Sequence, residues 1–121
     1  MLARAERMHR HMFGLQHEET ARPCWEPPVD VLETERDVIV FTALPGVDPE
    51  GVTLAIEEGV LLIAGQRTLP PELRTAVIHR LELPQGSFRR AVRLPPGRYD
   101  KVARTAANGC LIVTLRKQAR G

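Results

Sequence analysis

The fold is decided by Asn108-Gly109-Cys110-Leu111-Ile112-Val113-Thr114-Leu115, in which a turn dipeptide leads directly into a strand. Asparagine and glycine both adopt positive φ readily, and this is the geometry of a tight hairpin turn. We therefore expect the chain before Asn108 to fold back antiparallel on the chain after Gly109. Within the strand, Leu111, Val113 and Leu115 share one apolar face, while the opposite face is mixed. This pattern is typical of a central strand whose sheet packs one face on a second sheet.

Similar patterns predict further strands in the preceding chain. Apolar runs, alternating or continuous, occupy residues 29–34, 38–44, 52–56, 60–65, 87–94 and 102–106. Pro45-Gly46 ends the second run, and Gly59 lies in a turn between the third run and the fourth. Short strands at such regular spacing indicate a β-sandwich.

Composition limits the function. The chain has 121 residues, enough for one domain with its own core, and a net charge of +2 in which acidic residues nearly balance arginine. This balance gives no strongly positive surface that would attract a polyanion, so we expect no nucleic-acid partner. No apolar run approaches the roughly 18 residues of a membrane span. Cys24 and Cys110 lie far apart in the sequence, which favours a reduced, cytoplasmic location.

The sequence offers no catalytic, cofactor-binding or metal-binding motif. Ser87 is the only serine and has no histidine at a meaningful local spacing, and the adjacent Glu57 and Glu58 point to opposite faces of a strand. His9, His11 and His17 lack the cysteine or carboxylate partners that would complete a ligand set, which favours solvated histidines. We therefore expect a protein that is not an enzyme and needs no cofactor.

Residues 1–24 form a separate N-terminal arm. Its apolar residues recur at roughly helical spacing, which allows an amphipathic helix, although a frayed tail is at least as good an interpretation for an arm this short. Three prolines at 23, 27 and 28 mark the boundary, with Trp25 among them as an expected anchor. The predicted organisation is thus an arm (1–24), a β-domain (25–117) and a short tail (118–121).

Residues 66–85 contain the pair Pro70-Pro71 and several charges, and a loop this long inside a small domain is usually functional. The following strand places Phe88, Arg90, Val92 and Leu94 on one face. An arginine among inward-facing apolar residues requires a partner, for which Glu82 and a second chain are the two candidates.

These features resemble the α-crystallin domain of the small heat-shock proteins, in order and spacing, over about three quarters of the chain. The matching segments are Trp25-Glu26-Pro27 with Val29-Asp30-Val31, Leu44-Pro45-Gly46-Val47, Leu61-Leu62-Ile63-Ala64-Gly65-Gln66-Arg67, Glu82 with Gly86-Ser87-Phe88-Arg89-Arg90, Arg93-Leu94-Pro95, and Asn108-Gly109-Cys110-Leu111-Ile112-Val113. Each is weak alone, and their combination is specific.

The resemblance is to members of bacterial type. It implies an immunoglobulin-like antiparallel β-sandwich, and it implies that the protein is an ATP-independent holdase for non-native client proteins. It also implies that the long loop carries a strand, residues 76–83, which is exchanged with residues 29–33 of a second subunit to form a homodimer. The expected dimer interface comprises Val29, Val31, Ala76, Val77, Ile78, Arg80, Glu82 and Arg90. Arg90 falls at the family's dimer-seam arginine.

Two departures from the family pattern bear on assembly. The C-terminal Ile-x-Ile motif, which plugs a groove on the next dimer, has no counterpart after Lys117, and Arg104 replaces the usual small residue before the turn. Arg104 therefore alters or occupies that groove, and Arg116 stands where a proline is common. We expect dimers or small oligomers, with co-assembly with a sibling subunit as a further possibility.

Client binding is expected on exposed apolar surface of the arm and of a sheet-edge groove. The candidate residues are Met8, Met12, Phe13 and Leu15 of the arm, and Val52, Leu54, Ile56, Val102 and Arg104 of the groove. Val52, Leu54 and Ile56 are alternatively plain core residues. The competing class is a monomeric, co-chaperone-like β-sandwich that binds one folded partner.

Overall fold

The computed structural model describes residues 24–118, which fold almost entirely into β-structure. The strands are β1 (Val29–Glu33), β2 (Asp37–Ala43), β3 (Thr53–Glu57), β4 (Val60–Arg67), β5 (Gly86–Arg93), β6 (Tyr99–Ala107) and β7 (Cys110–Lys117). Two short 3₁₀ turns, η3 (Pro49–Gly51) and η4 (Pro71–Arg74), lie in the connections. These strands agree with the ones predicted from the sequence, so the all-β class is confirmed.

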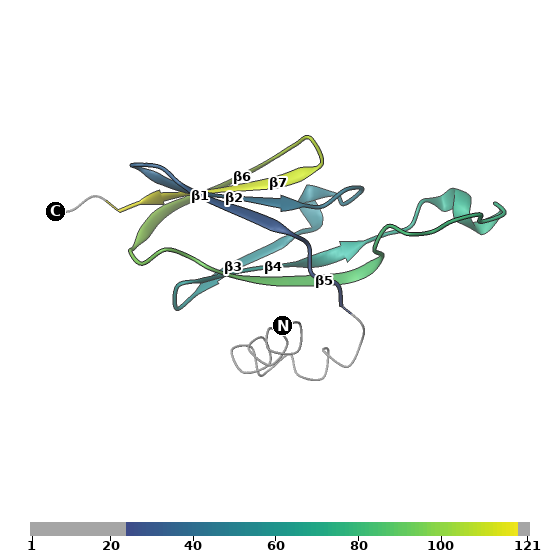
Figure 1. Cartoon of the computed structure of the whole chain (residues 1–121), viewed down its shortest axis with the longest axis horizontal. Coiled ribbons are helices and arrows are strands. Elements are labelled where there is room, and N and C mark those ends of the chain that lie inside the picture. The colour runs from purple at the N-terminus through teal and green to yellow at the C-terminus, as the bar shows by residue number, and fades with distance from the viewer. Residues whose placement is uncertain (1–23, 119–121) are drawn as a thin grey trace.

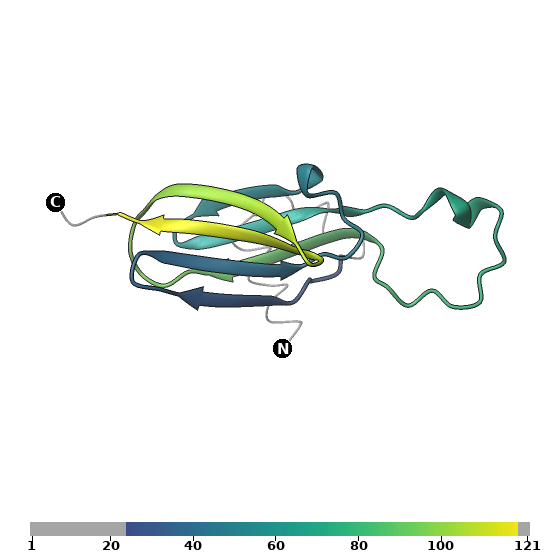
Figure 2. The ribbon, with the colours of Figure 1, turned by 90° about the horizontal axis from the view of Figure 1, so that it is seen from above.

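The strands form two antiparallel sheets that face each other (Figure 1). The four-stranded sheet has the order β1-β2-β7-β6, and the three-stranded sheet has the order β3-β4-β5. Seen from above in Figure 2, β1, β2, β7 and β6 lie side by side in this order. The edge strands β1 and β5 thus lie on one open side of the sandwich, and β6 and β3 lie on the other.

The core lies between the two sheets and is built from residues that alternate along each strand. In β7 the buried residues are Leu111, Val113 and Leu115, as the sequence pattern predicted, and they pair in register with buried or inward-facing residues of β2. The core cluster further includes Val38, Val40, Leu44, Val52, Leu61, Ile63, Phe88, Val92 and Leu94. Aliphatic side chains therefore supply nearly all of the buried apolar surface.

Two tight turns set the strand pairing. Asn108 and Gly109 have φ of 54° and 77°, so this turn between β6 and β7 has the left-handed backbone predicted from the dipeptide. Glu58 and Gly59 repeat the geometry between β3 and β4, with φ of 50° and 78°. Each turn fixes the register of its hairpin, because it joins the last pair of bonded residues directly.

The described chain begins by crossing the β1/β5 side of the sandwich. The backbone NH of Trp25 donates to the carbonyl of Ser87 at 3.1 Å, and the backbone NH of Arg89 donates to the carbonyl of Trp25 at 3.0 Å. The Trp25 ring lies 5.1 Å from the Phe88 ring, measured between centroids. Trp25 therefore anchors the start of the domain, as expected.

The long connection from β4 to β5 extends away from the sandwich as a protruding loop (Figures 1 and 2). Within one chain, residues 76–83 form no strand, and their pairing with a second chain stays a prediction. A strand needs a neighbour for its backbone groups, and the protruding loop has none within the described part of the chain. Any strand in this segment thus requires a second chain.

Candidate interaction site

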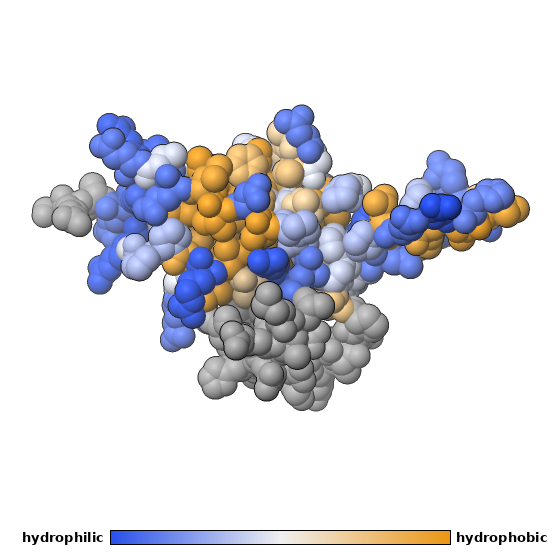
Figure 3. All heavy atoms as spheres, viewed as in Figure 1, coloured by the Kyte–Doolittle hydropathy of each residue, from blue (hydrophilic) through white to orange (hydrophobic). Residues whose placement is uncertain are grey.

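The β1/β5 side exposes apolar side chains along an unpaired strand edge. β1 pairs only with β2, so its other edge is open. Val31 is 39% exposed although it pairs with the fully buried Val40, and Leu32 on the opposite face is also exposed. Figure 3 views the molecule from this side and shows apolar surface gathered over the sandwich. An open apolar edge of this kind can accept a further strand.

Arg90 lies on the inward face of β5, opposite Ile63 of β4. Its Nη1 donates to the carbonyl of Pro27 at 3.3 Å, in the segment that crosses between the sheets. Glu82 instead pairs with Arg80 at 3.4 Å on the protruding loop. Of the two expected partners of Arg90, Glu82 is therefore wrong within one chain, because the protruding loop turns away from the sandwich. A partner on a second chain stays a prediction.

The protruding loop carries apolar side chains with nothing described to cover them. Val77 is 80% exposed, and Leu69, Ile78, Leu81 and Leu83 are exposed as well. Orange atoms at the end of the protruding loop in Figure 3 show the same feature. A single chain covers only part of these side chains, so the protruding loop presents a surface suited to another molecule.

The β3/β6 side has a different character. Val52 is buried in the core, which confirms the plainer of its two interpretations, while Leu54 packs partly against the core. Ile56 is 43% exposed and Val102 is 49% exposed, on the two edge strands of this side. Of the residues predicted for the sheet-edge groove, Val52 and Leu54 thus pack in or against the core, while Ile56 and Val102 are exposed.

Arg104 bridges the two sheets on the β3/β6 side. From β6, its Nη1 donates to the carbonyl of Val52 at 2.6 Å and to the carbonyl of Pro49 at 3.4 Å. Sequence reasoning placed Arg104 at the groove but gave no partner for it. Backbone carbonyls distant in sequence carry no sequence signal, so only the unusual arginine itself pointed to this contact.

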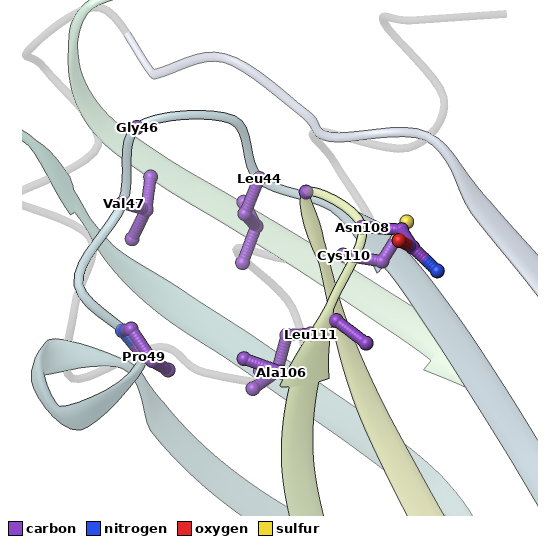
Figure 4. Close-up of a pocket in the computed structure, with 10 residues that line it drawn as sticks. Leu44, Gly46, Val47, Pro49, Ala106, Asn108, Cys110 and Leu111 are labelled. Atoms are coloured by element: carbon purple, nitrogen blue, oxygen red, sulfur yellow. The ribbon is translucent and has the colours of Figure 1, made fainter.

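A cavity of about 300 Å³, shown in Figure 4, lies beside Pro49, whose carbonyl accepts from Arg104. It lies between the loop that follows β2 and the hairpin of β6 and β7. Its walls are mostly apolar and are formed by Leu44, Gly46, Val47, Pro49, Ala106, Ala107, Asn108, Gly109, Cys110 and Leu111. Pro49 belongs both to this wall and to the pair of carbonyls that Arg104 bonds. No motif in the sequence indicated this cavity.

Two titratable groups at the other end of the four-stranded sheet have shifted pKa values. Burial raises the pKa of Tyr99 above its ordinary value, the charge of Glu33 raises it further, and Lys117 opposes this. A hydrogen bond to Asp37 raises the pKa of Arg116, whose Nε donates to the Asp37 carboxylate at 2.7 Å. Both raised pKa values favour the protonated group, which donates the hydrogen bond from Tyr99 to Pro95 and from Arg116 to Asp37.

The remaining expected sites are placed as follows. Met8, Met12, Phe13 and Leu15 lie outside the described residues. Cys24 is exposed and Cys110 is half-buried, and neither forms a disulfide. Residues 24–118 hold no cluster of three side chains that suits a metal ion. No helix within this part of the chain is long and apolar enough to cross a membrane.

The fold and these surfaces define the class of the protein, an antiparallel β-sandwich with open apolar edges and a bridging arginine on one of them. The sequence model of the Hsp20/alpha crystallin family matches residues 30–121. The chain belongs to this family, the small heat-shock proteins. The resemblance inferred from the sequence is therefore confirmed.

Known relatives include plant and bacterial proteins. The chain is 41% identical over 91 residues to a 16.9 kDa class I heat shock protein of rice, covering 74% of this chain and 61% of the relative. It therefore spans about three fifths of that relative's length. The crystal structure of hspA from Xanthomonas axonopodis matches with a TM-score of 0.69 and 30% identity, covering 79% of this chain and 97% of hspA.

A second solved structure, heat shock protein 16.0 from Schizosaccharomyces pombe, matches with a TM-score of 0.70 and 30% identity. It covers 80% of this chain and 70% of the yeast protein. These likenesses span the two sheets, so the immunoglobulin-like sandwich is confirmed.

Proposed function

We propose that this chain is an ATP-independent holdase that binds partly unfolded proteins and prevents their aggregation. The observation that carries the proposal is the exposed apolar surface along the unpaired edges of β3 and β6, above all Ile56 and Val102. Partly unfolded proteins expose extended apolar segments, which an open strand edge can bond through the main chain. Such bonding needs no particular client sequence.

The proposed unit is a homodimer formed by strand exchange. Residues 76–83 of one chain would pair with the open edge of β1 in the other, and would bury Val77 and Ile78 there. This pairing supplies backbone partners for both the protruding loop and the β1 edge. Arg80 and Glu82 lie in the same segment and would be placed at the seam, near Arg90 of the second chain.

The test for holdase activity is suppression of heat-induced aggregation of an unrelated thermolabile enzyme, without ATP. We expect suppression at near-stoichiometric ratio, together with a solution mass of a dimer or larger. A monomer that leaves the client to aggregate contradicts the proposal and favours the partner-specific module instead. Suppression that appears only after mixing with a sibling subunit favours co-assembly.

The exchanged strand is tested separately with Val77→Asp and its matched control Thr75→Asp. Both variants add one negative charge to the same protruding loop, but only Val77 lies in the segment proposed to pair. We expect Val77→Asp to yield monomers while Thr75→Asp keeps the wild-type mass, measured by sedimentation equilibrium. Equal masses for the two variants contradict the strand exchange.

A further inference from the structure

Arg104 carries a charge that the described chain leaves uncompensated. Both of its hydrogen bonds use Nη1 and go to neutral carbonyls, those of Val52 and Pro49. Within residues 24–118, no ion pair joins Arg104 to a carboxylate and no hydrogen bond uses its Nε or Nη2. The guanidinium has five N–H donors, and its Nε–Nη2 edge matches the two oxygens of a carboxylate.

Apolar surface flanks Arg104 on both sides. Val102, Arg104 and Ala106 share one face of β6, because each pairs with a buried residue of β7. Arg104 contacts Val52, and Ala106 and Pro49 line the same cavity, so β6 and the β3 edge run in opposite directions here. Val102 therefore falls toward the exposed Ile56, and Arg104 lies between this apolar end and the cavity end.

We propose that the β3/β6 side binds an extended peptide segment with the pattern apolar-x-acidic-x-apolar. The acidic side chain would bond the Nε–Nη2 edge of Arg104, and the two apolar side chains would occupy the cavity and the Val102 end. The pattern follows from strand geometry, because residues i and i+2 of an added strand point to the same face. The inference rests on the proposed function, since it specifies which client segments this side selects.

The positive charge also disfavours purely apolar segments. An apolar segment laid over Arg104 would remove water from a guanidinium that has only carbonyl partners, and burying an unpaired charge is costly. A carboxylate at the central position replaces the lost water with a charge-assisted, two-point contact. Arg104 thus discriminates between segments of equal apolar content.

The test uses two peptides, Thr-Ile-Thr-Glu-Thr-Ile-Thr and the same peptide with Gln for Glu, both blocked at their ends. Binding to the full chain is measured by calorimetry at low and high salt. We expect the Glu peptide to bind about tenfold more tightly than the Gln peptide at low salt, with a smaller ratio at high salt. Equal affinities, or no binding of either peptide, overturn the proposal.

Arg104→Leu and Arg93→Leu form a matched pair of variants. Each removes one positive charge from an exposed position, but Arg93 lies on β5 and pairs with Val60, away from the β3/β6 side. We expect Arg104→Leu to abolish the preference for Glu, and Arg93→Leu to retain it. A preference that persists in Arg104→Leu overturns the proposal.

Aggregation suppression by wild type and both variants is measured in parallel, which separates this inference from the proposed function. Wild-type suppression without a Glu preference overturns the inference and leaves the holdase intact. A Glu preference that depends on Arg104, without suppression, overturns the holdase and keeps the binding site.

Discussion

The two open sides of the sandwich differ in the contacts that join the two sheets across them. On the β1/β5 side the main chain itself crosses between the sheets, since Trp25 bonds β5 and the carbonyl of Pro28 accepts from the backbone NH of Ala43 at 3.0 Å. On the β3/β6 side the described crossing contact is a side chain, that of Arg104. A main-chain crossing persists as long as the domain is folded, whereas a side chain can change partner without unfolding. The β1/β5 side is therefore suited to holding the two sheets together. The β3/β6 side is suited to binding another molecule, because Arg104 can exchange its carbonyl partners.

The comparison predicts the largest stability loss on the β1/β5 side. Phe88→Ala removes the aromatic ring that lies against Trp25 and is 1% exposed, and we expect it to lower the free energy of unfolding by about 3–5 kcal/mol. The measurement is urea unfolding followed by the fluorescence of Trp25, the only tryptophan, and by circular dichroism.

The matched control on the other side is Val102→Ala, which trims a half-exposed side chain of β6. We expect it to cost less than about 1 kcal/mol, because a surface substitution leaves no cavity. Equal losses for Phe88→Ala and Val102→Ala would contradict the difference between the two sides.

A second test addresses the packing beneath Phe88. A Cβ added at Gly65 would lie 2.8 Å from Cζ of Phe88, closer than two carbons can approach. We expect Gly65→Ala to cost about 1–3 kcal/mol, measured by the same urea unfolding. Adding Phe88→Leu should make the alanine at residue 65 less costly than it is beside phenylalanine. An equal cost in both backgrounds would show that the loss does not come from this contact.

The sequence predicted those parts of the fold that depend on neighbours along the chain. Asn108-Gly109 predicted the hairpin because positive φ is a local property, and the alternation in β7 predicted which residues are buried. Trp25 was correctly expected to anchor the domain. The regular spacing of short strands predicted two packed sheets, and the family resemblance added their immunoglobulin-like character.

The features that sequence reasoning missed depend on contacts between distant residues. The carbonyls that accept from Arg104 belong to residues 49 and 52, and every residue type offers the same carbonyl. The partner of Arg90 is likewise a carbonyl, that of Pro27, rather than the charged Glu82 that the sequence suggested. The pairing of residues 76–83 with residues 29–33 of a second chain stays a prediction.

The third prediction concerns the side-chain crossing itself. Arg104→Leu removes the bonds to two carbonyls, and we expect a loss of about 1 kcal/mol in urea unfolding with an unchanged fold by circular dichroism. Arg93→Leu, which removes an exposed arginine elsewhere, should cost less than about 0.5 kcal/mol. Unfolding of Arg104→Leu at room temperature would show that this contact is structural and not exchangeable.

The smallest expected effect concerns how β6 is held at its other end. The hydroxyl of Tyr99 donates to the carbonyl of Pro95 at 2.7 Å, and burial is the main cause of its raised pKa. Tyr99 is the only tyrosine, so the ultraviolet absorbance of tyrosinate reports this group alone. We expect a titration midpoint above the ordinary value of 10.0 in the folded chain and a lower midpoint in urea.

The consequence for stability follows from the direction of this shift. The unfolded chain loses the Tyr99 proton near pH 10 while the folded chain still holds it. The contribution of Tyr99 is therefore complete below pH 10 and is lost as the pH rises through the folded pKa. Tyr99→Phe should weaken this decline. Since Tyr99 holds the start of β6 independently of Arg104, Arg104→Leu should leave the midpoint unchanged. A midpoint that moves in Arg104→Leu would mean that releasing the arginine loosens the whole strand, and the β3/β6 side could then not exchange partners without cost to the fold.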